Sequence, residues 1–79
     1  MRKVYVDVSA EFTKDGMVIP LSFEWEDGRT FEIDRLIDMQ RAASLKVGGI
    51  GIRYTIYVCG KLTHIWFDDN EMKWFLEGI

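Results

Sequence analysis

The sequence predicts an all-β fold in which five or six antiparallel strands follow one another as a meander. Apolar and polar residues alternate with a period of two along several segments, which is typical of strands with one buried face. Turn-forming residues separate these segments at similar spacings: Asp15-Gly16, Asp27-Gly28, Cys59-Gly60-Lys61 and Asp68-Asp69-Asn70. Asp-Gly is a strong hairpin signal, because both central residues of a type I′ turn have positive φ. We expect a small barrel or a strongly bent sheet, since closure removes exposed strand edges.

The first two strands show the clearest alternation. Residues 3–12 place an apolar side chain at every second position, and the second strand, Met17 to Glu26, does the same. On one face of the second strand we expect Met17, Ile19, Leu21, Phe23 and Trp25, with Trp25 well buried. Pro20 cannot donate a ladder hydrogen bond, so this strand is expected to be an edge or to carry a bulge there.

The third strand begins at Arg29, and its alternation breaks at Arg35-Leu36-Ile37, which a β-bulge explains. Residues 34–46 fit a strand or irregular structure, which we favour, but also a short helix from Asp34 to Gly48. Two further strands follow at residues 52–59 and 62–67. The last segment, residues 71–79, fits a helix or a strand, and adjacent aromatic residues in it favour the strand.

Composition limits the class of protein. The 79 residues correspond to one domain spanning 1–79, and 48% hydrophobic residues suffice for a core. The single cysteine, Cys59, excludes an internal disulfide and a multi-thiolate zinc site, and it is typical of a reducing compartment. No segment approaches the roughly 20 apolar residues of a membrane span, and no signal peptide is apparent. We therefore expect a cytoplasmic protein with no membrane partner.

Several short motifs together resemble a group of short, uncharacterised bacterial proteins. They are Trp25-Glu26-Asp27-Gly28-Arg29, Ile33-Asp34-Arg35, Arg41-Ala42-Ala43-Ser44 and Gly48-Gly49-Ile50-Gly51-Ile52-Arg53-Tyr54. The resemblance covers residues 3–75. It implies an all-β domain without an established activity, and it favours a strand over residues 34–44.

No residue pattern indicates an enzyme, and we expect no catalytic residue, metal or cofactor. The single histidine, His64, cannot form a multi-histidine metal site, and no third group orients a pair of Cys59 and His64. The glycine-rich residues 48–51 lack the Gly-Lys-Ser/Thr of a phosphate loop. Their amides could still form an anion-binding nest beside Arg53, although a glycine bulge explains them more simply.

The charges are distributed unevenly along the chain. Residues 35–53 carry a net charge of +3, which leaves −6 for the rest of a chain whose net charge is −3. This segment provides the candidate anion contacts: Arg35, Arg41, Lys46 and Arg53. One hypothesis is therefore weak binding of single-stranded nucleic acid, with Tyr54 or Tyr57 stacking on bases.

The last two strands carry apolar residues on both faces, which points to a second hypothesis. Ile65, Phe67 and Phe75 are expected to lie opposite the face that carries Trp66 and Trp74. A small domain has one core, so we expect Ile65, Phe67 and Phe75 to contact another protein, and foremost a second copy in a homodimer. The alternative is a C-terminal helix that covers this face within one chain. The favoured function is thus a non-enzymatic β-domain that acts through protein contacts or self-association.

Overall fold

The computed structural model describes residues 1–78, which form seven β-strands and no helix. The prediction of an all-β antiparallel fold is confirmed. One strand more than expected is present, because the third predicted strand is divided in two at Ile33 and Asp34. The strands are β1 (Arg2–Phe12), β2 (Val18–Glu24), β3 (Thr30–Glu32), β4 (Arg35–Ala43), β5 (Ile50–Val58), β6 (Lys61–Asp68) and β7 (Lys73–Gly78).

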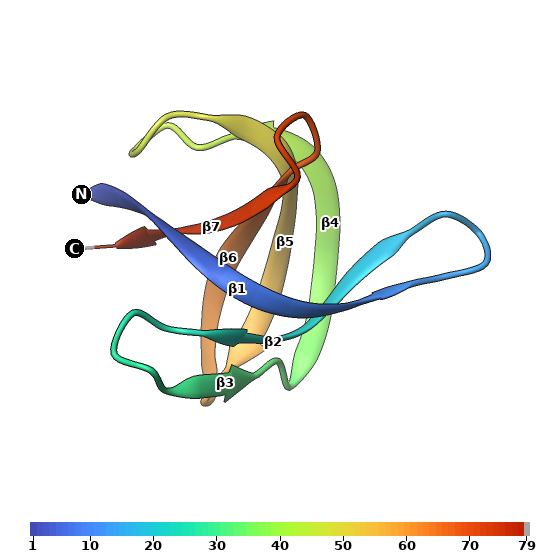
Figure 1. Cartoon of the computed structure of the whole chain (residues 1–79), viewed down its shortest axis with the longest axis horizontal. Helices are drawn as coiled ribbons and strands as arrows, with labels where there is room; N and C mark the ends of the chain where they lie inside the picture. Colours follow the sequence, from blue (N-terminus) through green and yellow to red (C-terminus); the bar gives the residue numbers. More distant parts are fainter. Residues whose placement is uncertain (79) are drawn as a thin grey trace.

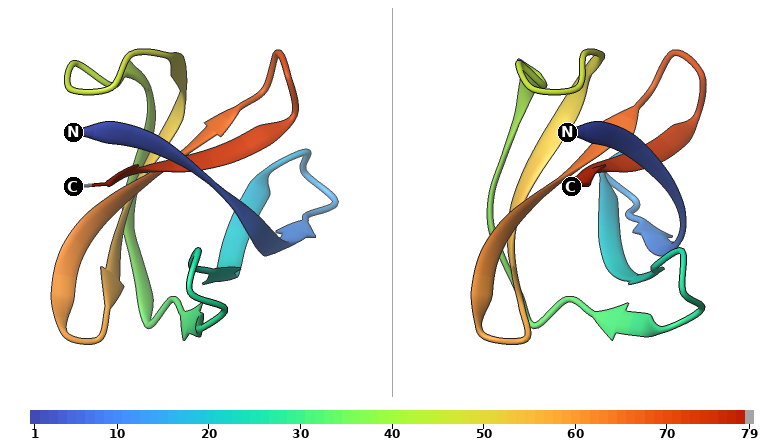
Figure 2. Two further views of the ribbon diagram at one scale, coloured as in Figure 1. Left: turned by 60° about the vertical axis from the view of Figure 1, so that its left-hand side comes forward. Right: turned by 90° about the vertical axis from the view of Figure 1, so that its left-hand side faces the viewer.

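All seven strands belong to one antiparallel sheet, whose order is β3-β2-β1-β7-β6-β5-β4. Strands β3 and β4 lie at opposite ends of this order but are consecutive in the chain. The backbone N–H of Ile33 donates to the carbonyl of Leu21 at 2.9 Å, and that of Asp34 to Tyr57 at 2.8 Å. The short link therefore contacts both ends of the sheet, and the sheet curls into a half barrel (Figures 1 and 2).

The turns differ from the expected type at both Asp-Gly sequences. Only Gly16 and Gly28 have positive φ there, whereas a type I′ turn needs two such residues. Each of these hairpins closes over a three-residue loop that ends in the glycine, as the hydrogen bonds between Thr13 and Met17 and between Trp25 and Arg29 show. The type I′ signature occurs at Cys59 and Gly60 instead, with φ of 52° and 73°.

Two β-bulges change the faces of the residues beside them. Ser22 pairs with Ser9, but Pro20 pairs with Ala10, so Leu21 is the extra residue in β2. The predicted bulge near Pro20 is confirmed, but it reverses the expected face of the residues before it: Pro20 is buried, and Leu21 and Met17 are exposed.

The second bulge lies in β4, where Ile37 is skipped between the pairs Leu36–Ile56 and Asp38–Thr55. This confirms the predicted break in alternation. It also confirms the strand interpretation of residues 35–43, and β7 confirms the strand interpretation of the C-terminal segment. Among residues 1–78, no helix is long and apolar enough to span a membrane.

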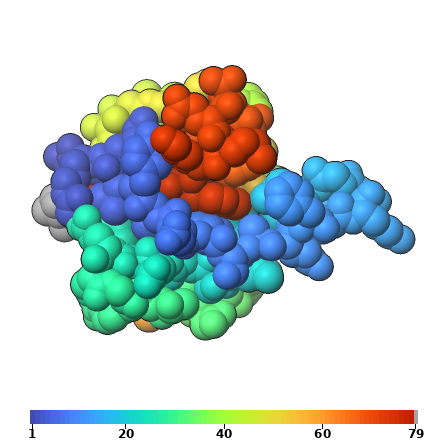
Figure 3. Space-filling view, in the orientation of Figure 1, coloured from blue at the N-terminus to red at the C-terminus, as the bar shows by residue number. Residues whose placement is uncertain are grey.

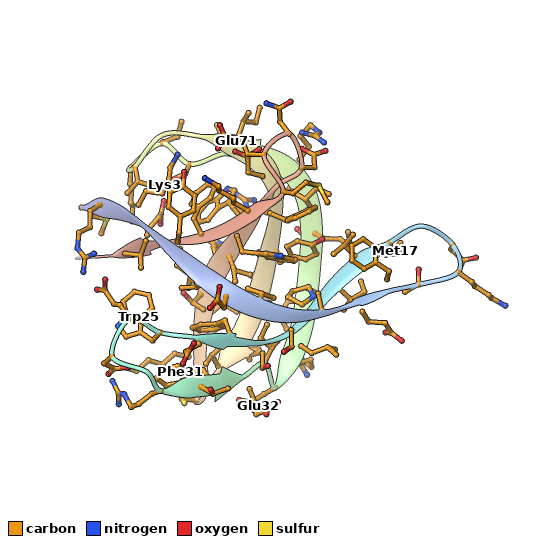
Figure 4. All side chains as sticks on the ribbon, viewed as in Figure 1. Lys3, Met17, Trp25, Phe31, Glu32 and Glu71 are labelled. Atoms are coloured by element: carbon orange, nitrogen blue, oxygen red, sulfur yellow. The ribbon has the colours of Figure 1, made fainter. Side chains whose placement is uncertain are left out.

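The core lies on the concave side of the sheet and draws mainly on β5, β6 and β7. Trp25 packs against this core but is only half buried, so the expectation that it is well buried is corrected. It lies where β2 ends and meets solvent on one side (Figure 4). The buried members are Phe23, Tyr54, Ile56, Val58, Ile65, Phe67 and Leu76.

The convex side of the sheet carries a second buried cluster. Trp66 and Phe75 are 2% and 1% exposed, and their rings stack at 5.5 Å between centroids. The β4–β5 connection folds over this cluster: Ser44 Oγ donates to Glu77 at 2.8 Å, and a Cβ on Gly49 would lie 3.3 Å from the Phe75 ring. One chain therefore covers both of its apolar faces, and a short loop does what a helix was expected to do.

Candidate functional site

A two-stranded arm projects from the body of the molecule. It consists of residues 9–21, the distal parts of β1 and β2 with their turn, and it extends to the right in Figures 1 and 3. Here β1 pairs only with β2, because its pairing with β7 ends at Val6. Likewise β2 pairs with β3 only from Ser22 onward. Both outer edges of the arm are thus without a strand partner among residues 1–78.

The arm exposes three large apolar side chains. Phe12 is 69% exposed, Leu21 48% and Met17 43%. Figure 4 shows Met17 within the arm. At its base the arm is tied to the barrel, because the buried Tyr54 hydroxyl donates to the carbonyl of Val18. Burial raises the pKa of this hydroxyl, so it remains a donor at neutral pH.

The structure places the three predicted contact residues inside the molecule. Ile65, Phe67 and Phe75 are 0%, 5% and 1% exposed. Phe67 pairs with Trp74, and Trp66 pairs with Phe75, so the expected grouping of faces is wrong: Phe75 shares the convex face with Trp66. A partner cannot contact these three side chains without displacing parts of the same chain.

The predicted anion contacts are divided among different environments. Arg41 forms an ion pair with Asp69, and the Arg35 guanidinium lies 5.2 Å from the centre of the Tyr57 ring. Arg53 lies directly opposite Trp66 across β5 and β6, on the convex face. Tyr54 is fully buried in the core and is not available to stack on a base. The structure therefore does not bring the four basic residues together with both tyrosines.

His64 lies in the strand next to Arg53 and is half buried. Burial lowers the pKa of its imidazole, and the positive charges of Arg53 and Lys46 lower it further, against the opposing effect of Glu77. Lys46 and Arg53 thus share one surroundings with His64. Within residues 1–78, no three His, Cys, Asp or Glu side chains are arranged to hold a metal ion.

A cleft of about 720 Å³ lies along β1, at the point where this strand exchanges one neighbour for another. Strand β1 pairs with β7 up to Val6 and with β2 from Asp7. Two half-buried tryptophans, three carboxylates and one ammonium group are among the lining side chains. The lining residues are Tyr5, Val6, Asp7, Val8, Glu24, Trp25, Glu26, Gly28, Met72, Lys73 and Trp74.

The carboxylates of the cleft are close together in the sheet. Asp7 lies directly opposite Glu24 in the pairing of β1 and β2, and both are exposed. Glu26 forms an ion pair with Arg2, and this lowers the pKa of the Glu26 carboxyl. For Asp7 and Glu24, residues 1–78 contain no such ion pair. Lys73 lies over the Tyr5 ring, with its Nζ 5.3 Å from the ring centre.

Sequence reasoning did not identify either the arm or the cleft. The alternation in residues 3–12 indicates that Asp7 faces outward, but the sequence does not show which residue lies opposite it. Comparisons of the chain with protein families, with curated proteins and with solved structures gave no match.

Proposed function

We propose that the chain is a non-enzymatic β domain that acts through protein contacts, and that the arm joins two copies into a homodimer. The observation that carries this proposal is the arm itself. A two-stranded hairpin is marginally stable in water unless it packs against something. This arm extends away from the barrel while it exposes Phe12, Met17 and Leu21.

Contact between two arms explains these features together. A two-fold dimer uses the same patch on both subunits, so each exposed apolar side chain is covered by its symmetry-related neighbours. The unpaired arm edges also offer N–H and C=O groups to another strand. The surface is thus different from the one predicted at Ile65, Phe67 and Phe75, but the proposed partner is the same. We also propose a cytoplasmic location, for which the lone thiol of Cys59 is the support.

The nucleic-acid alternative has less support. Its stacking residue Tyr54 is buried, and Arg41 is neutralised by Asp69. Arg35, Lys46 and Arg53 remain as candidate phosphate contacts. Weak binding that depends steeply on salt would favour this alternative, because phosphate contacts release counterions.

Sedimentation equilibrium from micromolar to millimolar protein concentration tests the dimer. We expect a monomer–dimer equilibrium that Phe12→Lys weakens by about tenfold or more, since burial of an aromatic side chain is replaced by burial of a charge. Leu45→Lys is the matched control, because Leu45 is 95% exposed and lies outside the arm. It should dimerise as the wild type does. A strict monomer at all concentrations would contradict the proposal.

A further inference from the structure

The carboxylate pair in the cleft has a feature that the fold alone does not explain. Asp7 and Glu24 are direct cross-strand neighbours, and like charges in this arrangement destabilise a sheet. Neither is in an ion pair within the described part of the chain. A positive group placed between them would remove the repulsion, so the pair complements a cation in charge.

The aromatic side chains of the cleft add a second preference for cations. Trp25 and Trp74 are half buried, and Tyr5 is 51% exposed. Aromatic faces attract ammonium and guanidinium groups, and tryptophan does so most strongly. A lysine or arginine side chain can also lay its aliphatic stem along apolar surface while its charged end reaches a carboxylate.

The backbone of β1 provides the third element. Because β1 changes partners between Val6 and Asp7, one edge has no partner before this point and the other has none after it. These edges lie inside the cleft, beside Gly28 on one side and Met72 on the other. An extended chain can add to such an edge through main-chain hydrogen bonds.

We propose that the cleft binds an extended segment of a partner protein and places a lysine or arginine side chain between Asp7, Glu24 and the two tryptophans. This contact is separate from the arm contact, because the cleft contains none of Phe12, Met17 and Leu21. The geometry favours a peptide over a metal ion, because Glu26 is already paired with Arg2 and only two carboxylates remain. Its negative charge also disfavours nucleic acid.

Titration with a defined peptide tests the proposal. The probe is an acetylated and amidated peptide of alternating valine and threonine with one central lysine. The matched probe has glutamate at that position. Because Trp25 and Trp74 line the cleft, we expect the lysine peptide to change tryptophan fluorescence, and added salt to weaken its binding. Equal binding of the two peptides, or no binding at millimolar peptide, would overturn the proposal.

Variants of the protein locate the binding. Asp7→Asn combined with Glu24→Gln should weaken the lysine peptide by about tenfold. Glu11→Gln, which removes an exposed carboxylate of the arm, should leave its affinity unchanged. The double variant removes only repulsion from the free protein, so its free energy of unfolding should be equal or higher. Unchanged affinity in the double variant would contradict the assignment.

Two further arms separate this proposal from others. Phe12→Lys should bind the peptide as the wild type does, so a failure of dimerisation and a failure of peptide binding are distinguishable. Butylammonium, which carries the charge without a peptide backbone, should bind at least about tenfold more weakly than the peptide. If it binds equally well, strand addition is wrong and the cleft accepts small organic cations instead.

Discussion

Backbone conformation determines which residue each turn of this chain needs. Cys59 is the first central residue of the β5–β6 turn, and its φ of 52° is unfavourable for a residue with a Cβ. Gly60, the second, tolerates its φ of 73°. The turn is therefore made by an unfavourable residue at one of its two positions, and the lone thiol is exposed there.

Cys59→Asn should stabilise the protein by up to about 1 kcal/mol, because asparagine adopts this conformation more readily. Chemical denaturation measures the change in the free energy of unfolding. Cys59→Ser is the isosteric control and should be nearly neutral. Cys59→Val should destabilise, since a β-branched side chain fits positive φ poorly. A destabilised asparagine variant would argue against the turn type.

A second prediction at the residue scale concerns pH. The pKa of His64 is lowered, mainly by burial, from its ordinary value of 6.5. The unfolded chain therefore binds a proton at a higher pH than the folded chain does. Stability should thus fall as pH decreases below about 6.5, and His64→Gln should lose this dependence between about pH 5 and 7.

The acidic groups titrate in a different range. Hydrogen bonds from Arg2, Arg29 and Arg41 lower the pKa values of Glu26, Asp27 and Asp69. These groups contribute to stability at neutral pH and lose that contribution only below about pH 4. Unfolding measured by denaturant at a series of pH values separates the two ranges. If His64→Gln shows the same slope as the wild type above pH 5, His64 is not its source.

At the scale of elements, strands were predictable and their faces were not. Alternation identifies β1 and β5 directly, and turn residues limit their ends. The bulge at Leu21 moves Met17 and Leu21 outward, although they alternate in phase with buried Phe23. A bulge depends on which partner residues pair, and this is a property of two strands. The same limit applies to the cleft, since the neighbourhood of Asp7 and Glu24 is set by register.

Close contact between β5 and β6 gives an element-scale prediction. A Cβ on Gly51 would clash with the backbone of Phe67, at 2.8 Å from its carbonyl carbon. Gly51→Ala should therefore destabilise the protein by about 1–3 kcal/mol or more, because backbone must move. In Gly16→Ala the new Cβ meets nothing within 4 Å, so only the positive φ contributes and the loss should be smaller. Equal losses would place the Gly51 effect elsewhere.

At the scale of the whole molecule, the chain solves the problem that its two-sided apolar strands raise. The concave face of the sheet encloses the core, and the β4–β5 loop covers Trp66 and Phe75 on the convex face. What remains exposed and apolar is the arm. Predicting this distribution from sequence would require knowing that residues 44–49 fold back over β7, and no local pattern in that loop encodes this contact.

The central claim is that the arm, and not the face of β6 and β7, contacts a second copy. Amide hydrogen exchange measured at low and at high protein concentration tests it most directly, because only amides at an interface gain protection as the dimer forms. We predict that amides of residues 9–12 and 18–21 exchange more slowly at high concentration, while those of β5 and β6 are unchanged. Arm amides that exchange equally fast at both concentrations, with new protection in β6 or β7, would contradict the account.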